Sequence, residues 1–128
     1  MELRRRRRRA RFVLTASRAA ADVRRHRRRS REAFVASLSS CHLLWFLAIA
    51  AKRGYIVDSY ADAASGVMEK NSAGQLAMTR ITLRPLATFS GSKLPDRAAL
   101  DALHHAAHAE CFIAASIRSE VVIAPRLA

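Results

Sequence analysis

Apolar residues recur at the spacing of a helix between residues 33 and 51. One row, with intervals of three and four, consists of Phe34, Leu38, Cys41, Trp45 and Ala48. A second row on the opposite side consists of Val35, Leu43, Phe46 and Ile49. Ser30 is suited to the N-cap of this helix, and Gly54 follows a basic last turn as a stop signal. Because a helix that is apolar all round is usually a core helix, we expect a long buried central helix.

The pattern changes from helical spacing to alternation after Gly54. The stretch from Tyr55 to about Met68 is a weak first strand, and "NSAG" at residues 71–74 is typical of a turn. Residues 77–89 then alternate between apolar and polar side chains, which predicts a β-hairpin with one buried face. Pro85 cannot donate to a strand ladder, so it marks an edge position or a bulge.

A second helix and a final strand complete the pattern. Leu100, Leu103, Ala107 and Cys111 recur at intervals of three, four and four, which places Cys111 on the core-facing stripe if the helix extends that far. Residues 117–123 alternate again and predict the last strand. The order helix, strand, strand, helix, strand predicts an α+β fold in one domain of residues 30–128.

The positive charge of the chain is confined to its start. Residues 1–31 contain fourteen Arg, no Lys and two acidic residues, whereas residues 32–128 contain nine basic and eight acidic residues. Such Arg runs repel themselves and bury little, so we expect residues 1–29 to be a disordered segment. Because Arg codons are largely GC-rich, the absence of Lys favours an out-of-frame or misplaced start. The alternative is a non-catalytic protein that binds nucleic acid or another polyanion through this segment.

Cys41 and Cys111 are the two cysteines of the chain, too few for the disulfide framework of a small secreted protein. Both lie on helix faces that should turn inward. They are either small buried hydrophobes or a redox pair, and spacing alone does not show that the two helices face each other. The uninterrupted apolar run, residues 43–51, is too short to span a bilayer, so we expect a cytoplasmic protein without a membrane segment.

Histidines of the second predicted helix raise the alternative of a metal site. His104, His108 and Cys111 stand at i, i+4 and i+7, a spacing that can present three ligands along one helical edge. A fourth ligand is not evident, and solvated or core-edge histidines are the simpler interpretation. We therefore expect neither a metal nor another cofactor.

Four segments together resemble one protein family. They read "EAFVASLSSCHLLWFLAIAAKRGYIVDSY", "GVMEKN", "ITLRPLATFSG" and "ALHHAAHAECFIAAS", in this order within residues 32–128. The chain is similar there to the OsmC/Ohr family of thiol peroxidases, in particular its OsmC-like peroxiredoxin branch. The resemblance implies an OsmC-like fold whose N-terminal strands are missing. It also implies an intertwined homodimer built around two long central helices.

The chemistry that the resemblance implies centres on the two cysteines. Cys41 matches the peroxidatic cysteine, whose thiolate attacks an organic hydroperoxide or hydrogen peroxide. Cys111 matches the resolving cysteine, which closes a disulfide that a dithiol or thiol reductant then reopens. Glu32 and His42 are candidate supporting residues. The apolar side chains expected beside the peroxide are Phe34, Trp45, Phe46 and Phe112.

The start of the domain departs from the family pattern. Family members open the central helix with Pro-Glu-Glu or similar, and the first Glu pairs with an Arg from a strand-rich N-terminal segment that stabilises the thiolate. Here Ser30 and Arg31 occupy the first two positions, and only the second Glu is kept, as Glu32. A buried thiol without a cation beside it forms less thiolate, so we expect an impaired peroxidase.

Overall fold

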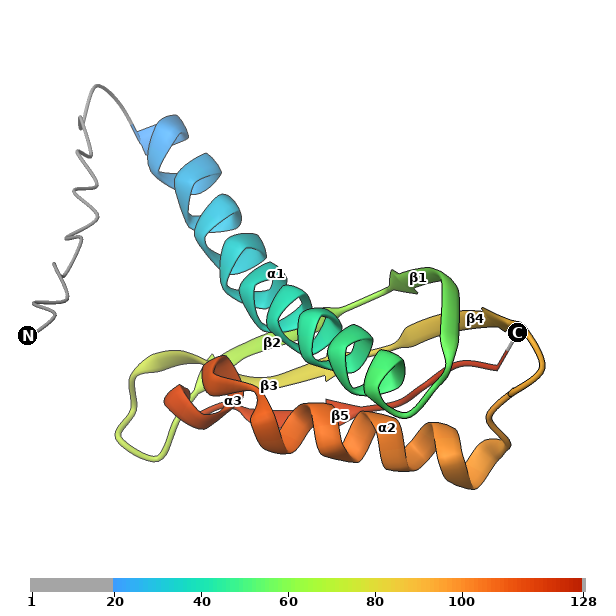
Figure 1. Ribbon diagram of the computed structural model, residues 1–128. Helices are drawn as coiled ribbons and strands as arrows, with labels where there is room; N and C mark the ends of the chain where they lie inside the picture. The colour runs from blue at the N-terminus through green and yellow to red at the C-terminus, as the bar shows by residue number, and fades with distance from the viewer. Residues whose placement is uncertain (1–19, 128) are drawn as a thin grey trace, which may run out of the picture.

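One long helix dominates the structure, a computed structural model that describes the backbone of residues 20–127 and the side chains of residues 29–127. Helix α1 (Ala20–Lys52) lies across the strands, and its first turns extend past them (Figure 1). Because it begins ten residues before Ser30, Ser30 is not its N-cap. Arg and Ala are good helix formers, so the basic stretch continues the helix where the charge pattern predicted disorder. The remainder of the predicted disordered segment lies outside the described residues.

The predicted core helix is present, and within a single chain its burial is one-sided. Leu38, Phe46 and Ala50 are fully buried on the side that faces the strands and α2, whereas Leu44 is 65% exposed on the other side. The part Arg29–Lys52, with a mean hydropathy of 1.8, is long and apolar enough to cross a membrane by length and composition. The core helix of a globular protein passes the same test.

The strands form the predicted hairpin, but each of its arms is broken into two. The four strands are β1 (Ile56–Asp62), β2 (Ser65–Lys70), β3 (Leu76–Leu83) and β4 (Pro85–Ser90). β1 pairs with β4 and β2 pairs with β3, both antiparallel. The predicted turn at residues 71–74 connects β2 to β3, and the side chain of Asn71 accepts two backbone N–H bonds there.

The breaks in the two arms lie opposite each other. Pro85 opens β4 and pairs with Asp62 at the end of β1, and the first residue of a strand is a position that tolerates proline. One carboxylate oxygen of Asp62 accepts the N–H of Arg84 at 2.7 Å, and the other accepts the hydroxyl of Ser39 at 2.5 Å. Because Ser39 belongs to α1, Asp62 ties the bend of the hairpin to the long helix.

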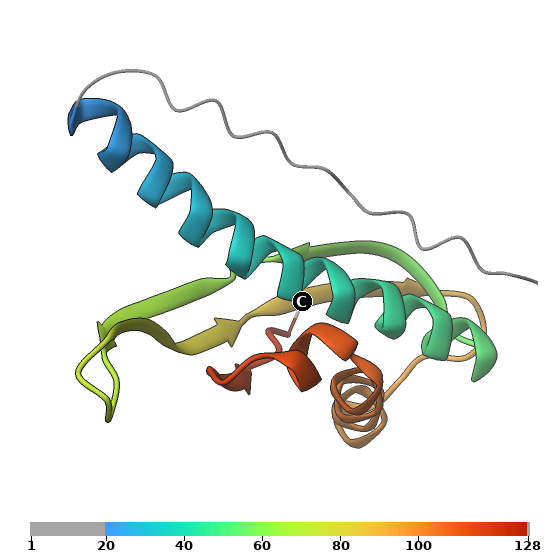
Figure 2. The same cartoon turned by 90° about the vertical axis from the view of Figure 1, so that its left-hand side faces the viewer.

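The C-terminal third adds two helices and a strand. These elements are α2 (Arg97–Glu110), α3 (Phe112–Ser116) and β5 (Glu120–Ile123), and β5 pairs with β3 in parallel. α2 runs in the direction opposite to α1, and Figure 2 shows it nearly end-on below that helix. Cys111 stands at the junction, as the C-cap of α2 and the N-cap of α3. The predicted second helix therefore ends one residue before Cys111.

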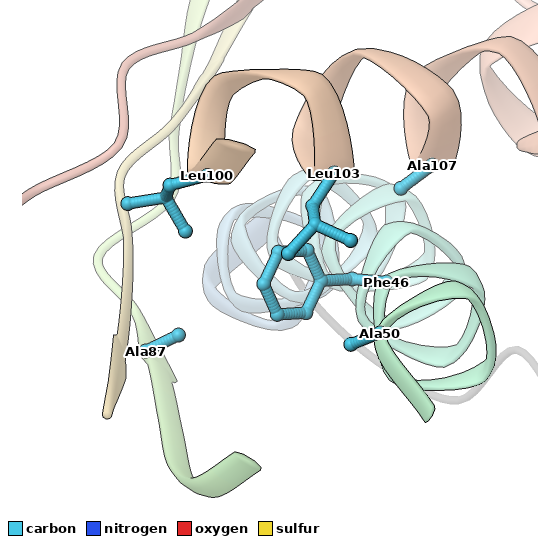
Figure 3. Close-up of a cluster of buried hydrophobic side chains, with 6 residues drawn as sticks. All are labelled: Phe46, Ala50, Ala87, Leu100, Leu103 and Ala107. Atoms are coloured by element: carbon cyan, nitrogen blue, oxygen red, sulfur yellow. The ribbon is translucent and has the colours of Figure 1, made fainter. Parts of the chain in front are cut away.

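The core consists of two clusters on the buried side of α1. Cluster 1 joins α1, α2 and β4 and contains Phe46, Ala50, Ala87, Leu100, Leu103 and Ala107 (Figure 3). Cluster 2 joins α1, β3 and the α2–α3 junction and contains Leu38, Cys41, Ile81, Leu83 and Cys111. Both cysteines therefore lie in the same part of the core.

Candidate active site

Cluster 2 brings the two thiols of the chain together. Cys41 is 5% exposed and Cys111 is 1% exposed, and both are free. Both side chains belong to the same buried cluster, and the Cys41 thiol lies near enough to raise the pKa of Cys111. The two inward faces that the sequence pattern predicted separately therefore turn toward each other.

The backbone around Cys111 holds its sulfur in place. Its Sγ accepts the N–H of Ala114 at 3.5 Å, and its own N–H donates to the carbonyl of His108 at 3.2 Å. Burial is the largest influence on this thiol and raises its pKa, the neighbouring Cys41 raises the pKa further, and the Ala114 N–H opposes both. Cys111 is therefore a protonated thiol near neutral pH.

The aromatic residues expected beside the peroxide occupy different places. Phe34 and Trp45 are half-buried and pack against cluster 2. Phe46 lies in cluster 1 and stacks on the ring of His104, and Phe112 is 63% exposed. The structure therefore brings two of the four predicted aromatic residues to the cluster that contains the thiols.

The two candidate supporting residues lie on other sides of α1. Glu32 is exposed and lines a cavity of about 620 Å³ together with Ser39 and Asp62, and Cys41 is not among the residues that line this cavity. His42 is 1% exposed, and its hydrogen-bond partner is His104 on α2, with 3.0 Å between Nε2 and Nδ1.

This buried histidine pair is the feature of the site region that the sequence interpretation missed. Burial is the main cause that lowers the pKa of His42 to about 4, and the nearby His104 and His108 lower it further. Burial likewise lowers the pKa of His104 to about 4, while Asp101 and Asp62 act in the opposite direction. Both rings are therefore neutral near pH 7. The signal in the sequence was a polar residue on each of two inward-facing apolar stripes.

The histidines do not assemble a metal site with Cys111. Within residues 29–127, no group of three His, Cys, Asp or Glu side chains is placed to hold a metal ion. The Nδ1 atom of His104 is occupied by its bond to His42, and Cys111 lies past the end of α2 in cluster 2. The i, i+4, i+7 spacing of His104, His108 and Cys111 thus fails to converge because the helix ends before its third member.

Comparison with known proteins identifies the family. The OsmC-like protein family matches residues 28–126. The chain belongs to this family. A solved OsmC-like protein of unknown function from Vibrio cholerae is 51% identical, with a TM-score of 0.74, and the match covers 75% of this chain and 62% of that one. This chain therefore spans less than two thirds of the length of that OsmC-like relative. A comparison with curated protein sequences gave no match.

More distant OsmC-like structures share the fold. The organic hydroperoxide resistance protein OhrB of Bacillus subtilis is 21% identical, with a TM-score of 0.60, over 77% of this chain and 68% of that one. An organic hydroperoxide resistance protein from Elizabethkingia anophelis is 14% identical, with a TM-score of 0.61, over 77% of this chain and 66% of that one. The predicted family and the OsmC-like fold are confirmed. None of these comparisons supports the alternative of polyanion binding.

Proposed function

We propose that this OsmC-like chain is a thiol peroxidase that reduces organic hydroperoxides, and hydrogen peroxide, through Cys41 and Cys111. The observation that carries the proposal is the juxtaposition of two buried free thiols from elements 70 residues apart in the chain. Two relatives that share the fold are named organic hydroperoxide resistance proteins, which supports the same chemistry.

Cys41 is the attacking residue in this proposal, and Cys111 resolves. Burial raises the pKa of the Cys111 thiol, which suits a resolving residue that reacts with the sulfenic acid and not with the peroxide. Phe34 and Trp45 pack against the same cluster, and their apolar surface favours a peroxide with an organic substituent over hydrogen peroxide.

The cycle has three steps. The Cys41 thiolate attacks the terminal oxygen of ROOH, so an S–O bond forms, the O–O bond breaks, and the departing alkoxide takes up a proton to become the alcohol. The Cys111 sulfur then displaces hydroxide from the Cys41 sulfenic acid, which gives the disulfide and, with the Cys111 proton, one water. An external dithiol transfers two electrons and two protons to the disulfide and restores both thiols. The net reaction converts one peroxide and one dithiol into alcohol, water and an oxidised dithiol.

A homodimer is part of the proposal. The open side of α1 carries an apolar stripe that one chain leaves uncovered, namely Ala33, Ala36, Leu44, Leu47, Ala48 and Ala51. Small residues and leucines on one helical face permit close helix packing, so a second copy of this helix suits the stripe. We place the dimer in the cytoplasm, since reducing compartments keep paired thiols free between turnovers.

Arg31 is expected to lower the peroxidase activity. The family resemblance places a Glu at this position, where it pairs with an Arg that stabilises the thiolate. Arg31→Glu should therefore accelerate peroxide reduction, because it restores the carboxylate of that pair.

The test is the consumption of cumene hydroperoxide by the reduced chain with an excess of dihydrolipoamide. Cys41→Ala should abolish turnover. Without the dithiol, Cys111→Ala should still consume one peroxide per chain while forming no intramolecular disulfide. Ser92→Ala in an exposed loop is the matched control and should keep the parent rate. Turnover by Cys41→Ala at the parent rate would refute the proposal.

A further inference from the structure

The histidine pair lies where the two thiol-bearing elements meet. His42 directly follows Cys41 on α1, and His104 lies two turns before Cys111 on α2. The rings are 1% and 3% exposed, their planes are within 4° of parallel, and Nε2 of His42 is 3.0 Å from Nδ1 of His104. A neutral imidazole carries one N–H donor and one acceptor nitrogen, so one ring donates to the other.

The contacts between α1 and α2 follow one another in antiparallel order. At one end the Cys41 thiol is the neighbour of Cys111, and next to it His42 bonds to His104. Phe46 then stacks on His104, with 4.4 Å between ring centroids, and packs with Leu103 in cluster 1. Along α1 the histidine pair thus lies between the thiol pair and the Phe46 contact.

The histidine bond differs in kind from the contacts around it. The hydrophobic attraction of the apolar contacts is non-directional and does not by itself fix which atoms face each other. A hydrogen bond fixes the separation and direction of its two atoms, and breaking it in the core leaves an unpaired polar nitrogen. The bond between His42 and His104 therefore sets the axial position and the rotation of α1 against α2.

We propose that His42 and His104 are positioning residues that hold Cys41 against Cys111 for disulfide formation. This inference rests on the proposed peroxidase cycle for its role in turnover. The pair acts on the second step, in which the Cys111 sulfur forms an S–S bond to Cys41 as the S–O bond breaks and water leaves. It does not act on the first step, because attack on the peroxide requires no atom of α2.

Two kinds of variant separate positioning from stability. His42→Leu/His104→Leu replaces both partners by apolar side chains, a change that leaves no unpaired polar atom and has little effect on stability. His42→Gln keeps an amide group near the position of Nε2 and so retains a bond to His104. Equal melting temperatures of parent and variants confirm that the fold is kept. If the double variant does not melt cooperatively, His104→Leu alone, which leaves α1 unchanged, takes its place.

The first measurement follows one turnover of the full chain with cumene hydroperoxide. A sulfenic-acid-selective probe and mass spectrometry give the rates of sulfenic acid formation and of disulfide closure. We expect the leucine variant to form sulfenic acid at the parent rate and to close the disulfide at least about tenfold more slowly, because alignment of reacting groups is lost. His42→Gln should recover closure to within about threefold of the parent rate. Closure at the parent rate in a folded leucine variant would overturn the inference.

The second measurement does not depend on peroxidase activity. Equilibration of the full chain with reduced and oxidised glutathione gives the effective concentration of one thiol relative to the other. We expect this value to fall by about tenfold or more in the leucine variant and to recover in His42→Gln. An unchanged effective concentration overturns the positioning role, whatever the peroxide assay gives. A fall in effective concentration in a chain that does not consume peroxide would refute the proposed function and leave the positioning role standing.

Discussion

Acid should destabilise the protein through its buried histidine pair. Burial lowers the pKa of both His42 and His104 from the ordinary value of 6.5 to about 4. Between these values the unfolded chain binds protons that the folded chain excludes, so the stability gained from the neutral pair is complete above pH 6.5. It is lost as the pH falls toward 4. At pH 5 the free energy of unfolding is lower by about 2 kcal/mol for each ring and by about 4 kcal/mol for the pair. These values follow from about 1.36 kcal/mol for each pH unit between the ordinary pKa of 6.5 and pH 5.

Urea unfolding followed by the fluorescence of Trp45, the single tryptophan, measures this loss. The free energy of unfolding is determined at pH 7.5, 6 and 5 for the parent chain and for His42→Leu/His104→Leu. Subtracting the variant removes the contributions of all other titrating groups, including Asp62, Asp101 and His108, which surround the pair. The parent chain should lose about 4 kcal/mol more than the variant between pH 7.5 and 5. Parallel curves for the two proteins would show that the folded state does not exclude these protons.

Three further predictions concern the dimer, the core and the bend of the hairpin. Leu44→Asp places a charge in the apolar stripe of α1 and should weaken self-association more than about tenfold, seen by light scattering as monomers at concentrations where the parent chain is dimeric. Leu103→Ala removes a fully buried side chain of cluster 1 and should lower the free energy of unfolding by about 2 to 5 kcal/mol. The control Leu94→Ala, at a 62% exposed position, should change the free energy of unfolding by less than about 0.5 kcal/mol. Asp62→Ala leaves the Ser39 hydroxyl and a backbone N–H without their acceptor and should cost about 1 to 3 kcal/mol in the same urea assay; an unchanged midpoint would show that these bonds do not hold the bend.

The sequence was most informative where periodicity is sustained. Helical spacing located α1, and alternation located the hairpin and the final strand, because each period reflects one face turned toward a core. Element boundaries were less certain. The helix does not begin at the predicted N-cap, Ser30, since the residues before it are themselves good helix formers. Pro85 predicted an irregularity in the second arm, but the position and the extent of the break became clear only from the pairing with Asp62.

For the candidate site, the sequence by itself determined that Cys41 and Cys111 turn inward and that both stand in motifs of the OsmC-like family. The tertiary structure alone decided what each inward residue meets. It brought the two thiols into one cluster, sent Phe46 into the other cluster, and paired His42 with His104 across two helices. The physical reason is that periodicity reports the direction of a side chain relative to its own helix axis. The identity of the group opposite depends on how two elements 60 or more residues apart pack, which no local spacing contains.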